Sequence, residues 1–126
     1  MSRVPYVYAV LRAVPRVDRG ECMNVGVVLY CQQRDFLAAS AHVDVARLLA
    51  LDAGTDVDGL RDGLRAVQDA CAEGSVSTAR EGGGRGAVFH WLTAPRSTVL
   101  QPGPVHGGVT GDPAGELERL TVRLVR

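Results

Sequence analysis

The sequence contains no lysine and only 5% aromatic residues. Its fourteen arginines balance fourteen acidic residues, so the formal net charge at neutral pH is zero. A neutral chain without a basic block lacks the clustered positive charge that nucleic-acid phosphates require, so we expect no nucleic-acid partner. The absence of lysine also excludes the phosphate-binding loop whose chemistry depends on that residue.

Long apolar runs and paired cysteine motifs are absent as well. No apolar stretch approaches the ~20 residues that a membrane helix needs, and segment 1–18 has no clear signal-peptide cleavage site. We therefore expect no membrane contact and a cytoplasmic location. The three cysteines have neither zinc-site spacing nor the even number of a disulfide framework. We predict buried thiols at Cys22, Cys31 and Cys71, and no metal or other cofactor.

The length of 126 residues fits one domain, 1–126, which can bury a core without covalent staples. Apolar residues make up 46% of the chain and charged residues 22%, which is typical of a globular protein. Within this domain, residues 74–86 are rich in Gly, Ser and Arg, so we predict a mobile loop there. The run "GGGRGA" fits a relaxed dinucleotide-binding pattern, but no strand precedes it and no acid follows at the required distance.

Alternating apolar residues predict two strands at 4–14 and 22–31, joined by a short turn as an antiparallel hairpin. We set Val14 opposite Cys22. A shift of one residue would expose an apolar face and is disfavoured, whereas a shift of two stays open. A third strand is expected at 35–41. The chosen register pairs Arg12 with Asn24, Val10 with Gly26 and Tyr6 with Tyr30.

Helices are expected to follow the strands. Asp44 caps a short helix with Val45, Leu48 and Leu49 facing inward, and Thr55 or Asp56 caps a longer one that ends near Glu73. Residues 87–94 favour helix over strand, 97–101 favour strand, and the Pro/Gly segment 102–111 is expected to be a loop. Asp112 and Pro113 begin a last helix whose core face is Leu117, Leu120 and Leu124.

The fold class that these elements predict is α+β. We expect an antiparallel sheet of three to four strands that begins with the N-terminal hairpin, with helices packed on one face. No metal, nucleotide or catalytic-triad motif accompanies it. A nucleophile could be built from Ser97 and His106, but no orienting acid or oxyanion hole is evident. We therefore predict no catalytic residues and favour a non-enzymatic protein.

Two polar segments, "RVDRGECMNVGVVLYC" and "FHWLTAPRSTVLQPGPVHGGVTGDP", resemble the bacterial domain-of-unknown-function family 3037. The resemblance covers most of the chain, and its "RGExxNVGV" core and "APRS" stretch are its most specific parts. Genes of this family are said to lie beside those of HipA-like kinases, so the resemblance implies such a kinase as partner. The matching polar positions are Arg16, Arg19, Glu21, Asn24, Arg96, Ser97, Gln101, His106 and Asp112.

We read all of these positions except the helix cap Asp112 as candidates for binding a ligand or a partner. The leading hypothesis is an accessory or binding module that acts with a partner protein. The alternative is a small enzyme or ligand-binding protein for a phosphate or carboxylate. A single site further requires Asn24 and Arg96 to lie within one ligand width. Arg19 and Glu21 could instead form a hairpin-end ion pair, and Arg96 and Ser97 could simply cap backbone.

Overall fold

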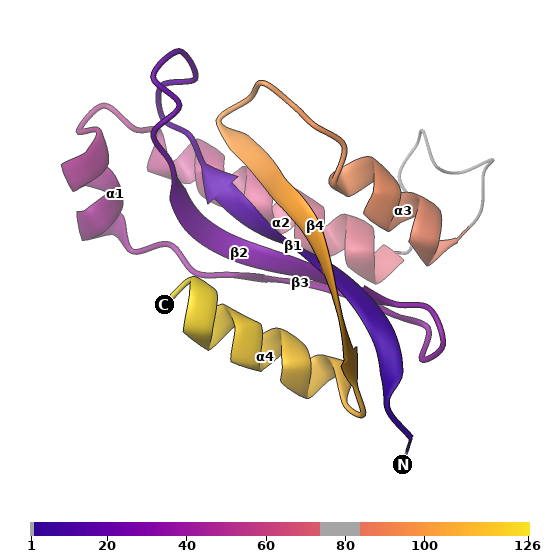
Figure 1. The fold of residues 1–126 in the computed structure, drawn as a ribbon. Helices are drawn as coiled ribbons and strands as arrows, with labels where there is room; N and C mark the ends of the chain where they lie inside the picture. Colours follow the sequence, from indigo (N-terminus) through magenta and orange to yellow (C-terminus); the bar gives the residue numbers. More distant parts are fainter. Residues whose placement is uncertain (1, 74–83) are drawn as a thin grey trace.

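A four-stranded antiparallel sheet forms the centre of the computed structural model, which describes residues 2–73 and 84–126 (Figure 1). The strand order is β3-β2-β1-β4, so the N-terminal hairpin is central and the last strand lies at one edge. The α+β class, the antiparallel sheet and the hairpin are therefore confirmed. The strands are β1 (Val4–Ala13), β2 (Met23–Cys31), β3 (Phe36–Ala41) and β4 (Leu100–Thr110), and the helices are α1 (Val45–Leu51), α2 (Val57–Glu73), α3 (Arg85–Leu92) and α4 (Pro113–Leu124).

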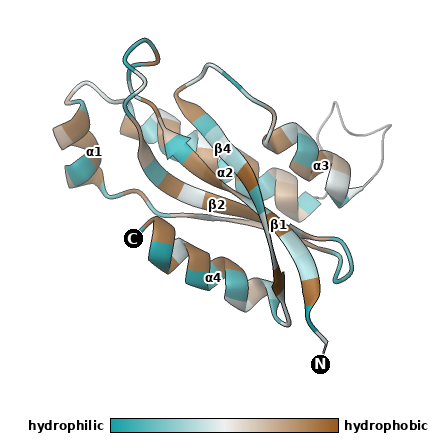
Figure 2. Ribbon diagram, in the orientation of Figure 1, coloured by the Kyte–Doolittle hydropathy of each residue, from teal (hydrophilic) through white to brown (hydrophobic). Residues whose placement is uncertain are grey.

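Helices cover both faces of the sheet, not one. On the first face, α1, α2 and α3 enclose the larger core, which includes Leu11, Val28 and Leu64. On the second face, α4 packs over β2 and β3, where Leu120 meets Val27. Apolar and polar residues alternate around α4, in keeping with this single buried side (Figure 2). The expectation of one covered face is thus wrong for α4, because β2 is apolar on both sides.

The two strands of the hairpin contain a β-bulge that changes the predicted register. Arg12 lies opposite Asn24 as expected, but Gly26 lies opposite Leu11, which leaves Val25 as the extra residue. The carbonyl of Val25 accepts a hydrogen bond from His42 N at 2.8 Å. Beyond the bulge the pairing is shifted by one residue, so the predicted partners of Val10 and Tyr6 are wrong. Their places opposite Gly26 and Tyr30 are taken by Leu11 and Val7.

The helix boundaries largely follow the sequence signals. The side chains of Asp44 and Asp112 cap α1 and α4, and Asp56 accepts a hydrogen bond from Gly59 N at the start of α2. Segment 87–94 is helical through Leu92, as expected. Leu49 is exposed rather than inward-facing, because the single buried position of the short helix α1 is Leu48.

Two segments differ from the expected loops. Residues 102–110 continue β4 instead of forming a Pro/Gly loop, because an edge strand tolerates proline where an inner strand does not. Of the predicted mobile loop 74–86, Arg85 and Gly86 belong to the first turn of α3, and residues 74–83 lie outside the described part of the chain. Within the described ranges, no helix has the length and apolar character to cross a membrane.

Candidate functional site

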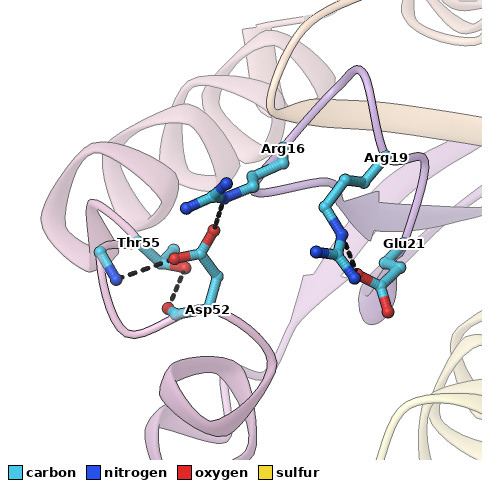
Figure 3. Close-up of polar contacts among 6 residues, drawn as sticks. Arg16, Arg19, Glu21, Asp52 and Thr55 are labelled. Carbon is cyan, nitrogen blue, oxygen red and sulfur yellow. Dashed lines mark hydrogen bonds and ion pairs between the residues drawn. The ribbon is translucent and has the colours of Figure 1, made fainter.

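The hairpin turn between β1 and β2 brings three of the predicted residues to one place. The amides of Arg19 and Gly20 both donate to the carbonyl of Arg16, at 3.1 Å each. Gly20 has a φ of 73°, a conformation that glycine adopts without steric cost. This tight turn keeps the side chains of Arg16, Arg19 and Glu21 near one another at the end of the sheet (Figure 3).

Arg16 is tied to the connection between α1 and α2. Its Nε donates to Oδ2 of Asp52 at 2.9 Å, and the second carboxylate oxygen accepts from Gly54 N at 2.9 Å. The carbonyl of Asp52 also accepts from the hydroxyl of Thr55 at 2.7 Å. Asp52 is therefore held by its own loop, and it in turn fixes the direction of the Arg16 guanidinium (Figure 3).

A second ion pair lies beside the first. Arg19 Nε donates to Glu21 Oε1 at 2.7 Å, and both side chains are more than half exposed. A pair in this position stabilises the fold by less than about 1 kcal/mol, because water screens both charges. The expected hairpin-end ion pair therefore exists, and it leaves both groups accessible from solvent.

Between the two ion pairs lies a hollow of about 350 Å³. Among residues 2–73 and 84–126, the hydrogen bonds of Arg16 and Arg19 use only Nε, so the terminal NH groups of both guanidiniums have no protein acceptor there. Two cations face two carboxylates, and the hollow is close to neutral. Its lining is Pro15, Arg16, Arg19, Glu21, Ala50, Leu51 and Asp52.

The two carboxylates of the hollow differ in how firmly they are held. The Gly54 amide, the Arg16 guanidinium and the nearby charge of Arg19 together keep the pKa of Asp52 below its usual range. The Asp52 side chain is only 18% exposed, against 51% for Glu21. Among the described residues, the Glu21 side chain accepts a hydrogen bond from Arg19 alone and none from a backbone amide. Glu21 is thus the more weakly held of the two carboxylates.

Asn24 lies elsewhere and holds a helix end. Its Nδ2 donates to the carbonyl of Leu124 at 2.9 Å, which satisfies an otherwise unpaired carbonyl at the C-terminal end of α4. The residue borders a separate hollow of about 280 Å³ that also contains Arg47 and Arg126. Cys22 lines this hollow too and is exposed, so the prediction of three buried thiols holds only for Cys31 and Cys71.

Arg96, Ser97 and Gln101 lie in or beside the connection from α3 to β4. The Arg96 guanidinium lies 4.4 Å from the centre of the Trp91 ring and donates to the Trp91 carbonyl at 2.6 Å. Gln101 Nε2 donates to the Thr98 carbonyl at 2.7 Å, and Ser97 is exposed. Arg96 thus lies against a helix of the first face, whereas Asn24 contacts α4 on the second. The structure does not bring these two residues together.

His106 lies in β4, opposite Tyr8, with the two ring centres 5.5 Å apart. Asp112 accepts from Gly115 N at 3.1 Å and caps α4. Of the eight candidates, the structure therefore gathers Arg16, Arg19 and Glu21 and places the other five outside their hollow. Sequence reasoning missed Asp52; the run "LDAGTD" signals a turn, but its pairing with Arg16 spans 36 residues. Within the described ranges, no three His, Cys, Asp or Glu side chains could together hold a metal ion.

The chain matches a known protein family. The model of the family described as "Protein of unknown function (DUF3037)" matches residues 8–125, which is nearly the whole chain. Neither the curated proteins nor the solved structures gave a match.

Proposed function

Because the chain belongs to the DUF3037 family of proteins of unknown function, we propose that it is a binding module without catalytic activity. It recognises an anionic group on a partner protein, for which a HipA-like kinase is the candidate. The observation that supports this is the hollow at the hairpin end, where Arg16 and Arg19 turn their terminal NH groups toward solvent. The kinase is suggested by the family resemblance and not by the geometry.

The chemistry of the hollow suits a carboxylate or a phosphate. A guanidinium presents a planar fork of donors that matches two oxygens of such a group. Asp52 holds Arg16 in place before binding, which lowers the entropic cost of ordering that side chain. Glu21 offsets the charge of Arg19 until a stronger anion replaces it.

The alternative is a free anionic small molecule, and the volume of about 350 Å³ is sufficient for one. Small-molecule sites are usually apolar and enclose most of the ligand, with a few polar groups that orient it. This hollow has four charged side chains among its seven lining residues and lies at a turn on the surface. An anionic side chain presented by another protein fits that geometry better than a free metabolite does.

The test is isothermal titration calorimetry of the chain against a HipA-like kinase from the same genome. We expect the double substitution Arg16→Lys and Arg19→Lys to weaken binding about tenfold or more, because lysine keeps the charge but loses the bidentate fork. Arg65→Lys is the matched control, since Arg65 also forms an exposed ion pair, with Asp62 on α2. We expect the control to bind like the wild type.

A second arm separates the two candidate functions. Inorganic phosphate and citrate are titrated into the isotope-labelled chain and followed by NMR shifts at Arg16, Arg19 and Glu21. Saturable shifts at millimolar or lower concentration, without any binding to the kinase, would support the small-molecule alternative. Kinase binding that is unaffected by the double lysine substitution would contradict the proposed role of the hollow.

A further inference from the structure

Strand β4 forms an edge of the sheet that no strand of the described chain covers. It is eleven residues long and pairs with β1 on its inner side only. An edge strand leaves alternate backbone N–H and C=O groups without a strand partner. Another extended chain satisfies those groups best, so we expect this edge to bind a β-strand.

The two halves of β4 differ in their protection against such pairing. The first half contains Pro102 and Pro104, which lack N–H donors, and its register with β1 shifts between Ala9 and Leu11. The second half, 105–110, has no proline and no acidic or basic side chain other than His106. Its two valines, Val105 and Val109, are 48% and 50% exposed. An exposed side chain, that of Arg3, donates to the Val109 carbonyl at 3.3 Å and would have to move aside for a strand to pair there. The second half is therefore the part of β4 that is better suited to accept a strand.

The sequence of this half is complementary to itself. In an antiparallel pair centred on Gly107 of two copies, Val105 of each copy lies opposite Val109 of the other. Cross-strand pairs of β-branched residues are among the favourable pairs in a sheet. His106 of each copy then lies opposite Gly108 of the other, which has no side chain to obstruct the ring. A two-fold axis relates the copies, so the assembly closes at two.

We propose that the protein forms a symmetric dimer in which 105–110 of β4 pairs with the same segment of a second copy, joining the two sheets into one of eight strands. The paired segments themselves carry no Arg, Lys, Asp or Glu, and the nearby Arg3 makes an exposed contact that can be released. An unrelated partner strand would not need the valine spacing that the self-pair uses. This proposal does not depend on the hollow at Arg16, so the two can fail separately.

The first test is sedimentation velocity of the full chain across the micromolar range. We expect a concentration-dependent monomer–dimer equilibrium for the wild type. The double substitution Val105→Lys and Val109→Lys places like charges opposite each other twice and should weaken dimerisation about tenfold or more. Val122→Lys is the control, because Val122 on α4 is equally exposed, at 51%. Far-UV circular dichroism checks that each variant is folded.

The second test examines the register. A chain with Val105→Lys is mixed with a chain carrying Val109→Glu, which the proposed pairing sets opposite each other. We expect this mixture to form a heterodimer more readily than either chain dimerises alone. A mixture of Val105→Lys with Val105→Glu should form less heterodimer, because the proposed pairing does not set the two charged side chains opposite each other.

Four results would overturn the proposal. The first is a wild type that stays monomeric throughout the concentration range, and the second is a dimer that survives the double lysine substitution. The third is equal disruption by Val122→Lys, which would place the interface elsewhere. Protection of the 105–110 amides from hydrogen exchange only when a HipA-like kinase is added would assign the edge to a strand of that partner instead.

Discussion

The two edge strands of the sheet, β3 and β4, differ in how far the helices cover them. β3 has six residues and is flanked by α2 on one face and α4 on the other. Gln68 Nε2 of α2 donates to the Ala39 carbonyl at 3.2 Å, and Thr121 of α4 donates to Ser40 Oγ at 2.6 Å. β4 is nearly twice as long and receives no comparable side-chain cover from a helix among the described residues.

The two edge strands therefore differ in how much they are packed against helices and in how much of their backbone is exposed. Around β3, helices on both faces bury apolar side chains and supply hydrogen-bond partners. Along β4 the exposed valines contribute little to the fold, and the outer backbone edge is covered only by an exposed Arg3 side chain at Val109 among the described residues. The candidate hollow lies toward the other end of β4, near Leu100, because Val14, just before the hairpin turn, bonds to Val99, just before β4.

The comparison predicts that truncating an apolar side chain on the β3 side has the largest effect. Leu120 of α4 is 8% exposed in the second core, so Leu120→Ala should lower the free energy of unfolding by about 2–4 kcal/mol. Val109→Ala on β4 should change it by less than about 0.5 kcal/mol, because half of that side chain is already in water. Urea denaturation of dilute protein measures both. Equal losses would remove the distinction between the edges.

A pair of glycine substitutions sharpens the same comparison. A Cβ at Gly26 would clash with the carbonyl oxygen of Ser40 in β3, whereas at Gly107 its nearest neighbour would be the Tyr6 carbonyl at 3.6 Å. We expect Gly26→Ala to destabilise the fold by about 1–3 kcal/mol, because β2 and β3 must move apart. Gly107→Ala should be nearly neutral, within about 0.5 kcal/mol. Thermal melts of both variants decide this, and a tolerated Gly26→Ala would contradict the close packing of β3.

Much of the fold could be predicted because its signals are local. Asp44 and Asp112 cap their helices through bonds to residues three positions further along, and the α2 stripe that includes Leu60 and Leu64 repeats at helical spacing. The Arg12–Asn24 pair follows from the short turn that joins β1 and β2. Each of these features depends on residues that are close in sequence. A sequence pattern can therefore predict it.

The features that escaped prediction depend on distant residues. The Val25 bulge is supported by His42 from beyond β3, and β4 becomes a strand only because β1 offers it a partner. The prolines of β4 indicate a loop when read alone, and their place at an edge is a property of the sheet order. At the candidate site, Asp52 is brought to Arg16 by the packing of α1. Tertiary contacts set these features.

The smallest predicted effect concerns how α4, the helix that covers β3, is held to β1. Tyr6 Oη donates to Glu116 Oε2 at 3.0 Å, and Glu116 also accepts from Arg119. Arg119 first, and then Tyr6, lower the pKa of the Glu116 carboxyl, while burial opposes them. Burial and the bond to Glu116 raise the pKa of Tyr6 to about 12, so the phenol keeps its proton at neutral pH.

A carboxyl whose pKa is lower in the folded state stabilises the fold above its unfolded pKa, and this contribution is lost as the pH falls through the folded value. We therefore expect the Glu116 contribution to be complete near pH 7 and to be lost in acid, as the pH falls through the lowered pKa of the folded state. Glu116→Gln should cost less than about 1 kcal/mol at pH 7 and almost nothing in acid. Urea denaturation at both pH values tests this, with Glu118→Gln as the control, since Glu118 is 64% exposed on the same helix. An equal loss at both pH values would show that the charge of Glu116 is not the source of the stabilisation.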